Sequence, residues 1–151
     1  MNPKVKIQLD VETAVYLGVI PGITPLIPDR NYSETHCKIE IEIDKNGKRF
    51  KLNGPLLSRE DFSMNIRELI YQTENEFEEM GSVELMYTNT KVGFEFRPAR
   101  DKFTVFEIKF GKDSAPDWWA NSSECRVGGE VENSELIQNL KELQRISEMI
   151  T

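Results

Sequence analysis

The sequence predicts an α+β fold in which one or two antiparallel sheets, with about six to seven strands in total, carry two amphipathic helices on one face. Three observations lead to this prediction. Apolar residues alternate with polar ones in several short runs, as they do in half-buried strands. Two longer segments repeat their apolar residues at helical spacing instead. The strand patterns follow one another through short turns, which favours antiparallel pairing over alternating strands and helices.

The first strand is expected in residues 4–12, in the segment KVKIQLDVE. Its apolar face holds Val5, Ile7, Leu9 and Val11. The next segment, AVYLGVI, continues this sheet or forms a second strand. Three prolines then lie within residues 21–36, and their spacing predicts an irregular loop.

The clearest strand pattern is CKIEIEIDKNGKRFKL, residues 37–52. Apolar and charged residues alternate up to Asn46-Gly47, a dipeptide that favours the tight turn of a hairpin. Phe50 and Leu52 resume the apolar face after this turn. The charged face of the first strand holds three carboxylates: Glu40, Glu42 and Asp44. We therefore expect a β-hairpin with an acidic outer face.

The apolar period becomes helical after Gly54-Pro55. Ser58 and Asp61 have the spacing of a capping box and predict the start of the helix, and Gly81 occupies the position just past its end. The buried face is expected to hold Phe62, Ile66, Leu69, Ile70, Phe77 and Met80. Carboxylates crowd the end of this helix, where they oppose its macrodipole. They are Glu74, Glu76, Glu78 and Glu79.

Four strands and a second helix complete the chain. Three strands are expected at residues 83–87, 92–96 and 103–110. In the third, Phe103 and Val105 lie opposite the other apolar residues, which predicts a two-faced or bulged strand. The segment CRVGGEV forms the last strand, and Asn133 or Ser134 caps the final helix. The apolar face of that helix holds Leu136, Ile137, Leu140, Leu143 and Ile146.

Length and charge limit the classes of function. The 151 residues fit a single domain spanning residues 1–151. A net charge of −7 argues against binding to nucleic acid or to an anionic membrane, since both need a basic patch, and it favours a basic protein partner. No apolar run is long enough to span a bilayer and no signal-peptide core is present, so we expect a cytoplasmic protein. Cys37 and Cys125 are then expected to be reduced thiols.

Groups that could catalyse a reaction or hold a cofactor are few. The single histidine, His36, stands beside Cys37, but neighbours in a strand point to opposite faces and do not form a catalytic pair. The sequence has no cysteine and histidine spacing typical of a zinc site and no glycine-rich phosphate-binding motif. We therefore expect no catalytic residue, no metal and no cofactor. A carboxylate-dependent hydrolase remains an alternative, because acidic residues are plentiful.

The segment SAPDWWANSSE, within a predicted loop at residues 111–124, contains both tryptophans of the chain. Trp118 and Trp119 either fold back as a lid over the core or form a recognition loop, because tryptophan is enriched at the centre of protein interfaces. A small-ligand or carbohydrate-binding module that uses this pair is another alternative. The candidate partner-binding residues are Trp118, Trp119, Asp117, Glu40, Glu42, Asp44, Glu74, Glu78 and Glu79.

The order of these elements resembles that of the WapI-type immunity proteins, which are small acidic bacterial proteins encoded beside contact-dependent polymorphic toxins. The resemblance covers residues 37–148. It rests on an EDF…L helix after a hairpin, a glycine before a V-x-L-x-Y-like strand pair, and a short strand that leads into the helix SELIQNLKELQRI. The resemblance implies a protein without catalytic activity that binds a cognate toxin, often a basic nuclease, and covers its active site. Acidic patches would speed association with such a partner.

Overall fold

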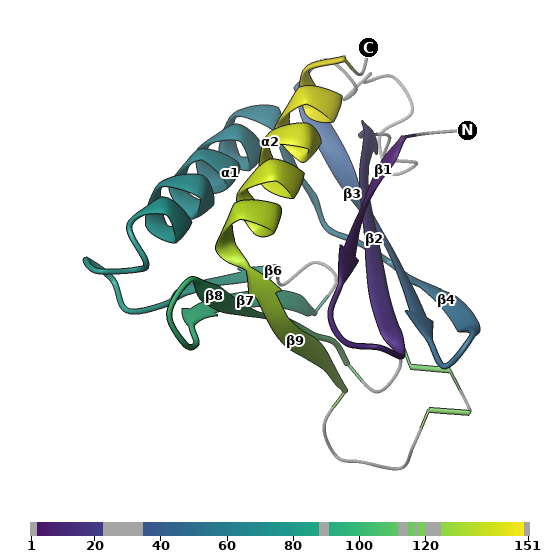
Figure 1. The fold of residues 1–151 in the computed structure, drawn as a ribbon. Coiled ribbons are helices and arrows are strands. Elements are labelled where there is room, and N and C mark those ends of the chain that lie inside the picture. Colours follow the sequence, from purple (N-terminus) through teal and green to yellow (C-terminus); the bar gives the residue numbers. More distant parts are fainter. Residues whose placement is uncertain are drawn as a thin grey trace.

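The computed structural model describes residues 3–22, 35–87, 91–111, 115–116, 118–119 and 125–149. Within these residues, nine strands form two antiparallel sheets and two helices pack beside each other, which confirms the predicted α+β class (Figure 1). The strands outnumber the six to seven expected, because residues 13–21 form a separate strand and residues 56–58 add a short one.

Sheet A contains the first five strands. They are β1 (Lys4–Gln8), β2 (Thr13–Pro21), β3 (His36–Lys45), β4 (Lys48–Leu52) and β5 (Leu56–Ser58). Their order is β1-β2-β3-β4, and β5 also pairs with β3. The predicted hairpin is confirmed as β3 and β4. It closes through a two-residue turn in which Asn46 and Gly47 have φ angles of 55° and 80°, as such turns require.

The end of β1 differs from the prediction. Val11 was expected on the apolar face of the strand, but 97% of its surface is exposed. The chain turns before it, because the amide of Leu9 donates to the Thr13 carbonyl and the amide of Glu12 donates to the Asp10 carboxylate. An aspartate that bonds the backbone two residues on is a turn-forming device, and here it interrupts an alternation that continues in the sequence.

Sheet B contains the remaining four strands, in the order β6-β7-β8-β9. They are β6 (Val83–Tyr87), β7 (Val92–Pro98), β8 (Phe103–Lys109) and β9 (Arg126–Glu132). Each residue of β8 pairs with one residue of β9, and its register with β7 also runs without interruption, so the strand is not bulged. Phe103 and Val105 are half-buried on one face and Phe106 is buried on the other. Of the two alternatives, a two-faced or a bulged strand, β8 is therefore the two-faced one.

The two helices are α1 (Arg59–Glu74) and α2 (Asn133–Met149). They pack against each other on the core side of sheet A, as predicted, and α2 also contacts sheet B (Figure 1). The cap of α1 is confirmed, because the Ser58 hydroxyl accepts a hydrogen bond from the Asp61 amide at 3.0 Å. At the start of α2, the side-chain oxygen of Asn133 accepts instead from the Thr104 hydroxyl at 2.6 Å, which ties the helix to β8.

The helix α1 ends earlier than predicted. It stops at Glu74, and the chain continues as a turn in which Glu76 and Phe77 both have positive φ angles. Phe77 is buried as expected, but outside the helix, whereas Met80 is exposed. Gly81 has the left-handed conformation foreseen for it, but at the end of the turn rather than next to the helix.

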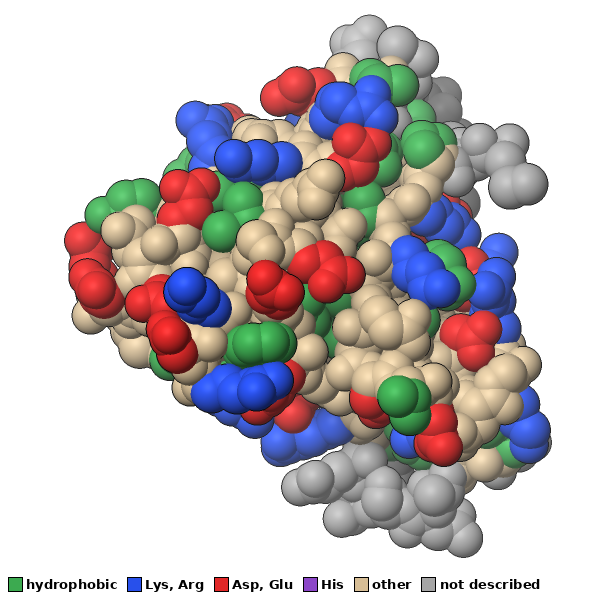
Figure 2. All heavy atoms as spheres, in the orientation of Figure 1, with side chains coloured by type: hydrophobic (Ala, Val, Ile, Leu, Met, Phe, Trp, Pro, Cys, Tyr) green, Lys and Arg blue, Asp and Glu red, His purple; other side chains and the backbone are tan. Residues whose placement is uncertain are grey.

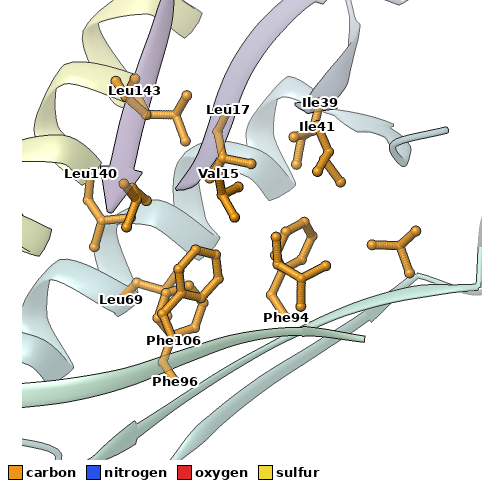
Figure 3. Close-up of a cluster of buried hydrophobic side chains, with 14 of the residues drawn as sticks. Val15, Leu17, Ile39, Ile41, Leu69, Phe94, Phe96, Phe106, Leu140 and Leu143 are labelled. Carbon is orange, nitrogen blue, oxygen red and sulfur yellow. The ribbon is translucent and has the colours of Figure 1, made fainter. Parts of the chain in front are cut away.

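The core lies between the two sheets and the helix pair, and all of these elements contribute to it (Figure 3). The labelled residues are Val15, Leu17, Ile39, Ile41, Leu69, Phe94, Phe96, Phe106, Leu140 and Leu143. The rings of Phe96 and Phe106 stack with 4.7 Å between their centroids. Where sheet B approaches the end of β1, a side chain at Gly129 would come within 2.2 Å of the Leu9 carbonyl oxygen, so glycine permits this contact.

Parts of two predicted loops lie outside the described residues. These parts are residues 23–34 of the proline-containing loop, and residues 112–114, 117 and 120–124 of the tryptophan loop. Neither α1 nor α2 combines the length and the apolar composition needed to cross a membrane.

Candidate functional site

The tryptophan segment packs against the end of the β3–β4 hairpin. Trp119 is half-buried, and its ring lies edge-on to the rings of Phe50 and Phe110, with centroid distances of 5.6 and 5.4 Å. Trp118 meets Phe50 at 5.4 Å but keeps 41% of its surface exposed. The sequence suggested either a lid over the core or a recognition loop. Trp119 fits the first alternative because it covers the core, and Trp118 fits the second because it remains accessible.

Lysines flank these two rings. The ammonium nitrogen of Lys45 lies 4.6 Å from the ring centroid of Trp119, and that of Lys48 lies 5.3 Å from the ring centroid of Trp118. Both distances fit cation–π contacts, which place a positive charge over a ring face. Asp117 lies outside the described residues. The described surroundings of the tryptophans are therefore basic, not acidic.

The carboxylates of β3 share the outer face of sheet A, and two of the three, Glu42 and Asp44, form ion pairs there. Lys4 lies 3.1 Å from Glu42, and the Arg49 guanidinium lies 3.5 Å from Asp44 and 3.9 Å from Glu42. Glu40 is half-buried, and one of its carboxylate oxygens is buried without a hydrogen-bond partner among the described residues. These groups form cross-strand pairs of the kind that stabilises a sheet, rather than an open acidic surface.

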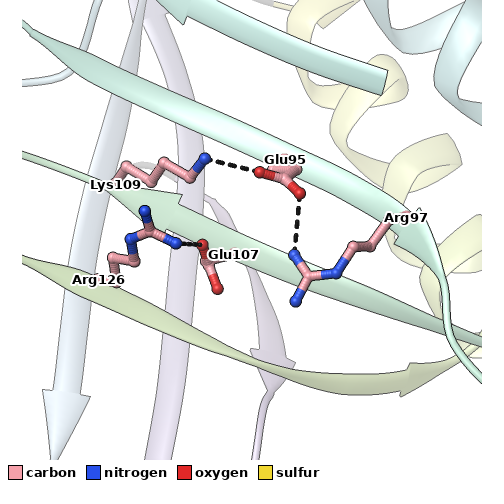
Figure 4. Close-up of polar contacts among 5 residues, drawn as sticks. All are labelled: Glu95, Arg97, Glu107, Lys109 and Arg126. Carbon is pink, nitrogen blue, oxygen red and sulfur yellow. Dashed lines mark hydrogen bonds and ion pairs between the residues drawn. The ribbon is translucent and has the colours of Figure 1, made fainter. Parts of the chain in front are cut away.

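The outer face of sheet B is also balanced in charge (Figure 4). Glu95 accepts hydrogen bonds from Lys109 at 2.7 Å and from Arg97 at 2.9 Å, and Arg126 lies 3.2 Å from Glu107. The hydrogen bond from Lys109, with that from Arg97 beside it, holds the pKa of Glu95 below its ordinary value. Four carboxylates of the two outer faces, Glu42, Asp44, Glu95 and Glu107, are therefore paired with cationic side chains.

The excess negative charge of the chain lies in one segment of the sequence. Residues 59–87, which we call the acidic segment, comprise α1, the following turn and β6. They hold eight of the 26 acidic residues of the chain but only two of its 19 basic residues, which gives a net charge of −6 out of −7. The rest of the chain, with 18 acidic and 17 basic residues, is nearly neutral.

The carboxylates of the acidic segment are open to solvent. All eight are exposed, and none forms an ion pair with a lysine or arginine in the part of the chain that the structure describes. They are Glu60, Asp61, Glu68, Glu74, Glu76, Glu78, Glu79 and Glu84. Acidic side chains gather at the left extremity of the molecule in Figure 2, over the end of α1 and the turn that follows it. The exposed side chains of Tyr71 and Met80 also belong to this region.

The turn at residues 74–80, which we call the acidic turn, has a defined backbone. The amide of Phe77 donates to the Gln72 carbonyl at 2.7 Å, and the amide of Glu76 donates to the Thr73 carbonyl at 3.2 Å. This pair of bonds is the Schellman pattern, whose left-handed position is usually glycine but is here Glu76, with a φ of 52°. Burial of Phe77 anchors the turn and leaves its carboxylates outside.

The electrostatics of the acidic turn are unfavourable for stability. Four carboxylates lie at or just beyond the C-terminal end of α1, where the helix dipole is negative, and the last turn of the helix contains no basic residue. The hydroxyl of Tyr71 donates to Glu79 at 3.2 Å, and this hydrogen bond, together with the nearby negative charges, raises the pKa of Tyr71. The fold thus keeps a cluster of like charges where they destabilise the helix.

A groove of about 410 Å³ lies along the same segment, between α1 and β6. Leu57 of β5 and seven residues of the acidic segment line this edge groove: Asp61, Met64, Asn65, Glu84, Leu85, Met86 and Tyr87. Met64 and Met86 are 57% and 55% exposed, respectively. The Asn65 amide donates to the Tyr87 hydroxyl at 2.9 Å and so joins the two walls. Burial raises the pKa of Tyr87, although this hydrogen bond opposes the shift.

The predicted site residues fall into three separate regions. Trp118 and Trp119 lie at the tip of the β3–β4 hairpin, and the three β3 carboxylates line the outer face of sheet A. Glu74, Glu78 and Glu79 lie at the end of α1, on the opposite side of the view in Figure 1. The structure therefore does not bring the candidates together. The sequence interpretation missed Glu84 and the edge groove, although a count of net charge along the chain would have shown the acidic segment.

The described groups offer little catalytic chemistry. The Cys37 thiol is buried, and desolvation raises its pKa to about 11, so it stays protonated and is a poor nucleophile at neutral pH. His36 is half-buried, and its Nδ1 lies 2.8 Å from the Thr35 hydroxyl. No group of three or more histidine, cysteine or acidic side chains within the described residues is placed to hold a metal ion.

Comparison with known proteins adds no assignment. The chain matches no protein family model, and no curated protein is significantly similar to it. The WapI-type resemblance remains a prediction from the order and pattern of the elements.

Proposed function

We propose that this protein is a non-enzymatic binding protein of the cytoplasm that holds a basic protein partner on its acidic segment. The partner that best fits the resemblance to the WapI-type proteins is a secreted bacterial toxin domain, which this protein would neutralise by covering its active site. One observation carries the proposal. Residues 59–87 hold a net charge of −6, and their eight exposed carboxylates have no ion-pair partner among the described residues.

The contrast with the two sheets supports this assignment. Glu42 and Glu95 each bind two cationic side chains, so these two carboxylates on the outer faces of the sheets are compensated within the fold. An uncompensated acidic surface attracts a basic partner over a distance and raises the rate of association. It also mimics the phosphate charge of a nucleic acid, which is the substrate that a basic nuclease binds. The acidic segment is the surface best suited to this role.

The acidic turn lowers the stability of the fold, and a binding function would explain why its residues are kept. The carboxylates of Glu74, Glu78 and Glu79 oppose the dipole of α1, and Glu76 occupies a backbone conformation that favours glycine. Strained and mutually repelling groups are often retained where they serve a function. A basic partner would neutralise these charges, and exposed Tyr71 would add apolar contact area.

The two other functions considered from the sequence receive less support. A carbohydrate stacks on an open indole face, whereas Lys48 lies over the ring of Trp118 and Lys45 over that of Trp119. A paired-acid hydrolase needs two carboxylates in one cleft with unequal environments. The carboxylates of the acidic segment are all exposed instead.

A rescue experiment tests the proposal. The C-terminal domain of a large secreted protein encoded beside this gene is expressed in bacteria, with and without the present protein. We expect growth to be restored by the wild type and by E12Q/E135Q/E148Q, which removes three exposed carboxylates elsewhere, but not by E74Q/E78Q/E79Q. Equal rescue by both triple variants would exclude the acidic turn as the binding surface, and failure of the wild type would exclude the immunity function.

A further inference from the structure

In the part of the chain that the structure describes, β6 is an edge strand that contains no lysine, proline or bulge and only one charged side chain, that of Glu84. Among the described residues it pairs only with β7, in a continuous antiparallel register from Val83 to Tyr87. Edge strands normally carry lysine, proline or a bulge, or are very short, because a free edge invites pairing with another chain. The sequence of β6, VELMY, has none of these features over five residues.

The other outer strands do have such protection. The strands β1 and β4 carry lysines, namely Lys4 and Lys6 in β1 and Lys48 and Lys51 in β4. The strand β5 has three residues, and β9 contains Arg126 and two adjacent glycines. The only charge on β6 is negative, so the edge that it leaves unpaired among the described residues is suited to accept a strand with basic side chains from outside.

The edge groove beside β6 has the shape and charge to receive such a strand. Its volume is about 410 Å³, and both Met64 and Met86 present exposed side chains to it. Methionine side chains adapt their shape to different apolar partners. The charged residues in its lining are both acidic, namely Asp61 of α1 and Glu84 of β6. A segment with basic side chains would therefore be attracted to this groove.

Resting on the proposed function, we infer that the edge groove binds an extended segment of the basic partner, which adds to sheet B as a strand beside β6. Residues in a strand alternate between the two faces of the sheet. On β6, Leu85 and Tyr87 are half-buried toward the core, whereas Glu84 and Met86 are exposed on the other face. The preferred segment alternates apolar side chains, which pack toward Leu85 and Met64, with lysine or arginine side chains near Glu84.

Backbone pairing is the property that distinguishes this mode from simple charge attraction. The amide and carbonyl groups of an added strand would bond those of β6, so binding would depend on free amides in the ligand as well as on its charge. A peptide with the same side chains but methylated backbone nitrogens keeps the charge and loses the donors. Comparison of the two peptides separates strand addition from electrostatic binding.

The test uses the heptapeptide acetyl-KVKVKVK-amide and a version methylated at its central five backbone nitrogens. Both are titrated into the ¹⁵N-labelled protein, and amide shifts and hydrogen exchange are followed by NMR. We expect the unmodified peptide to slow the exchange of amides in Val83–Tyr87 and the methylated peptide to bind at least about tenfold more weakly. The variants M86K and E84K should weaken binding to a similar extent, because lysine protects an edge and repels the ligand. The matched control M149K, on an equally exposed methionine of α2, should change binding by less than about twofold.

Three results would overturn the inference. If both peptides bind equally and perturb residues 74–80, strand addition is wrong while the acidic surface of the proposed function stands. If the exchange of β6 amides is unchanged, or if M86K and E84K, folded as judged by their spectra, bind like the wild type, the groove is not the site. If neither peptide binds at about 1 mM, both the groove and the affinity of the acidic segment for basic ligands are contradicted.

Discussion

The side-chain amide of Asn65 on α1 donates a hydrogen bond to the hydroxyl oxygen of Tyr87 on β6, with 2.9 Å between the two atoms. Tyr87 also meets the ring of Phe94 edge-on, with centroids 6.0 Å apart. The same tyrosine therefore contributes to the core of sheet B and fixes the distance between the two walls of the edge groove. Both Asn65 and Tyr87 also line a small apolar cavity of about 40 Å³.

Removal of this hydroxyl should destabilise the fold measurably. We expect Tyr87→Phe to lower the free energy of unfolding by about 1 kcal/mol, because the half-buried Asn65 amide would lose its acceptor. Tyr71→Phe is the matched control, since the Tyr71 hydroxyl bonds Glu79 on the surface, and it should lower the free energy of unfolding by clearly less than Tyr87→Phe does. Urea denaturation followed by far-UV circular dichroism measures both values. Equal decreases in the free energy of unfolding for the two variants would show that the hydrogen bond between Asn65 and Tyr87 does not stabilise the fold more than the surface bond of Tyr71.

The two tryptophans should differ in their effect on stability. Trp119→Ala removes a half-buried ring that packs against Phe50 and Phe110, and we expect it to lower the free energy of unfolding by about 2–3 kcal/mol. Trp118→Ala removes a more exposed ring and should cost less than about 1 kcal/mol. Circular dichroism is the suitable probe in urea, because the substitutions remove the fluorophores. A larger loss for Trp118 would contradict the packing described above.

The acidic turn should become more stable when its left-handed position is relieved. Glu76→Gly places glycine at a φ of 52°, and we expect it to raise the free energy of unfolding by about 0.5–1 kcal/mol relative to Glu76→Gln. The glutamine variant removes the same charge but keeps the strained backbone. Thermal and urea unfolding of both variants give the comparison. If the glycine variant were less stable, the conformation of this turn would not carry the strain inferred for it.

The buried thiol of Cys37 should make stability fall at alkaline pH. Its pKa is raised from 9.0 to about 11, chiefly by desolvation, so the folded protein keeps a proton that the unfolded chain releases. This contribution to stability is complete below pH 9 and is lost as the pH rises from 9 to about 11. We expect the loss to reach at most about 2 kcal/mol.

The matched variant for this experiment is Cys37→Ala, which cannot ionise at this position. The difference in unfolding free energy between the wild type and this variant should shrink over that pH range, while the ionisation of tyrosines and lysines affects both proteins alike. A difference that stays constant from pH 8 to pH 11 would show that the thiol has the same pKa in the folded and unfolded states.

Local features of the chain were predictable where short-range chemistry determines them. The turn at Asn46-Gly47 and the cap at Ser58 formed as expected, because each depends on residues within a few positions. The predicted end of α1 was wrong. Phe77 fits the helical spacing of apolar residues, but its φ of 61° places it outside the helix. The backbone turns so that the ring of Phe77 is buried, and the spacing of apolar residues in the sequence does not reveal this turn.

The site was less predictable, because it depends on contacts between distant segments. Glu42 and Asp44 of β3 are paired with Lys4 of β1 and Arg49 of β4, and this requires the strand order and register of sheet A. The position of β6 at the edge of sheet B, where it pairs only with β7 among the described residues, likewise depends on the division of the strands into two sheets. The concentration of charge in residues 59–87 was visible in the sequence, since counting along the chain needs no structure.

Binding to the basic toxin domain that the proposal expects to be encoded beside this gene tests the central claim most directly. Dissociation constants are measured by calorimetry for the wild type, E74Q/E78Q/E79Q and E12Q/E135Q/E148Q, at low and at high salt. We predict that at low salt the acidic-turn variant binds at least about tenfold more weakly than the wild type, whereas the dissociation constant of the control variant differs by less than about threefold. Added salt should reduce the difference in affinity between the wild type and the acidic-turn variant, because it screens the charges. Equal affinities for the two triple variants, or binding that does not respond to salt, would contradict an acidic segment that recognises its partner by charge.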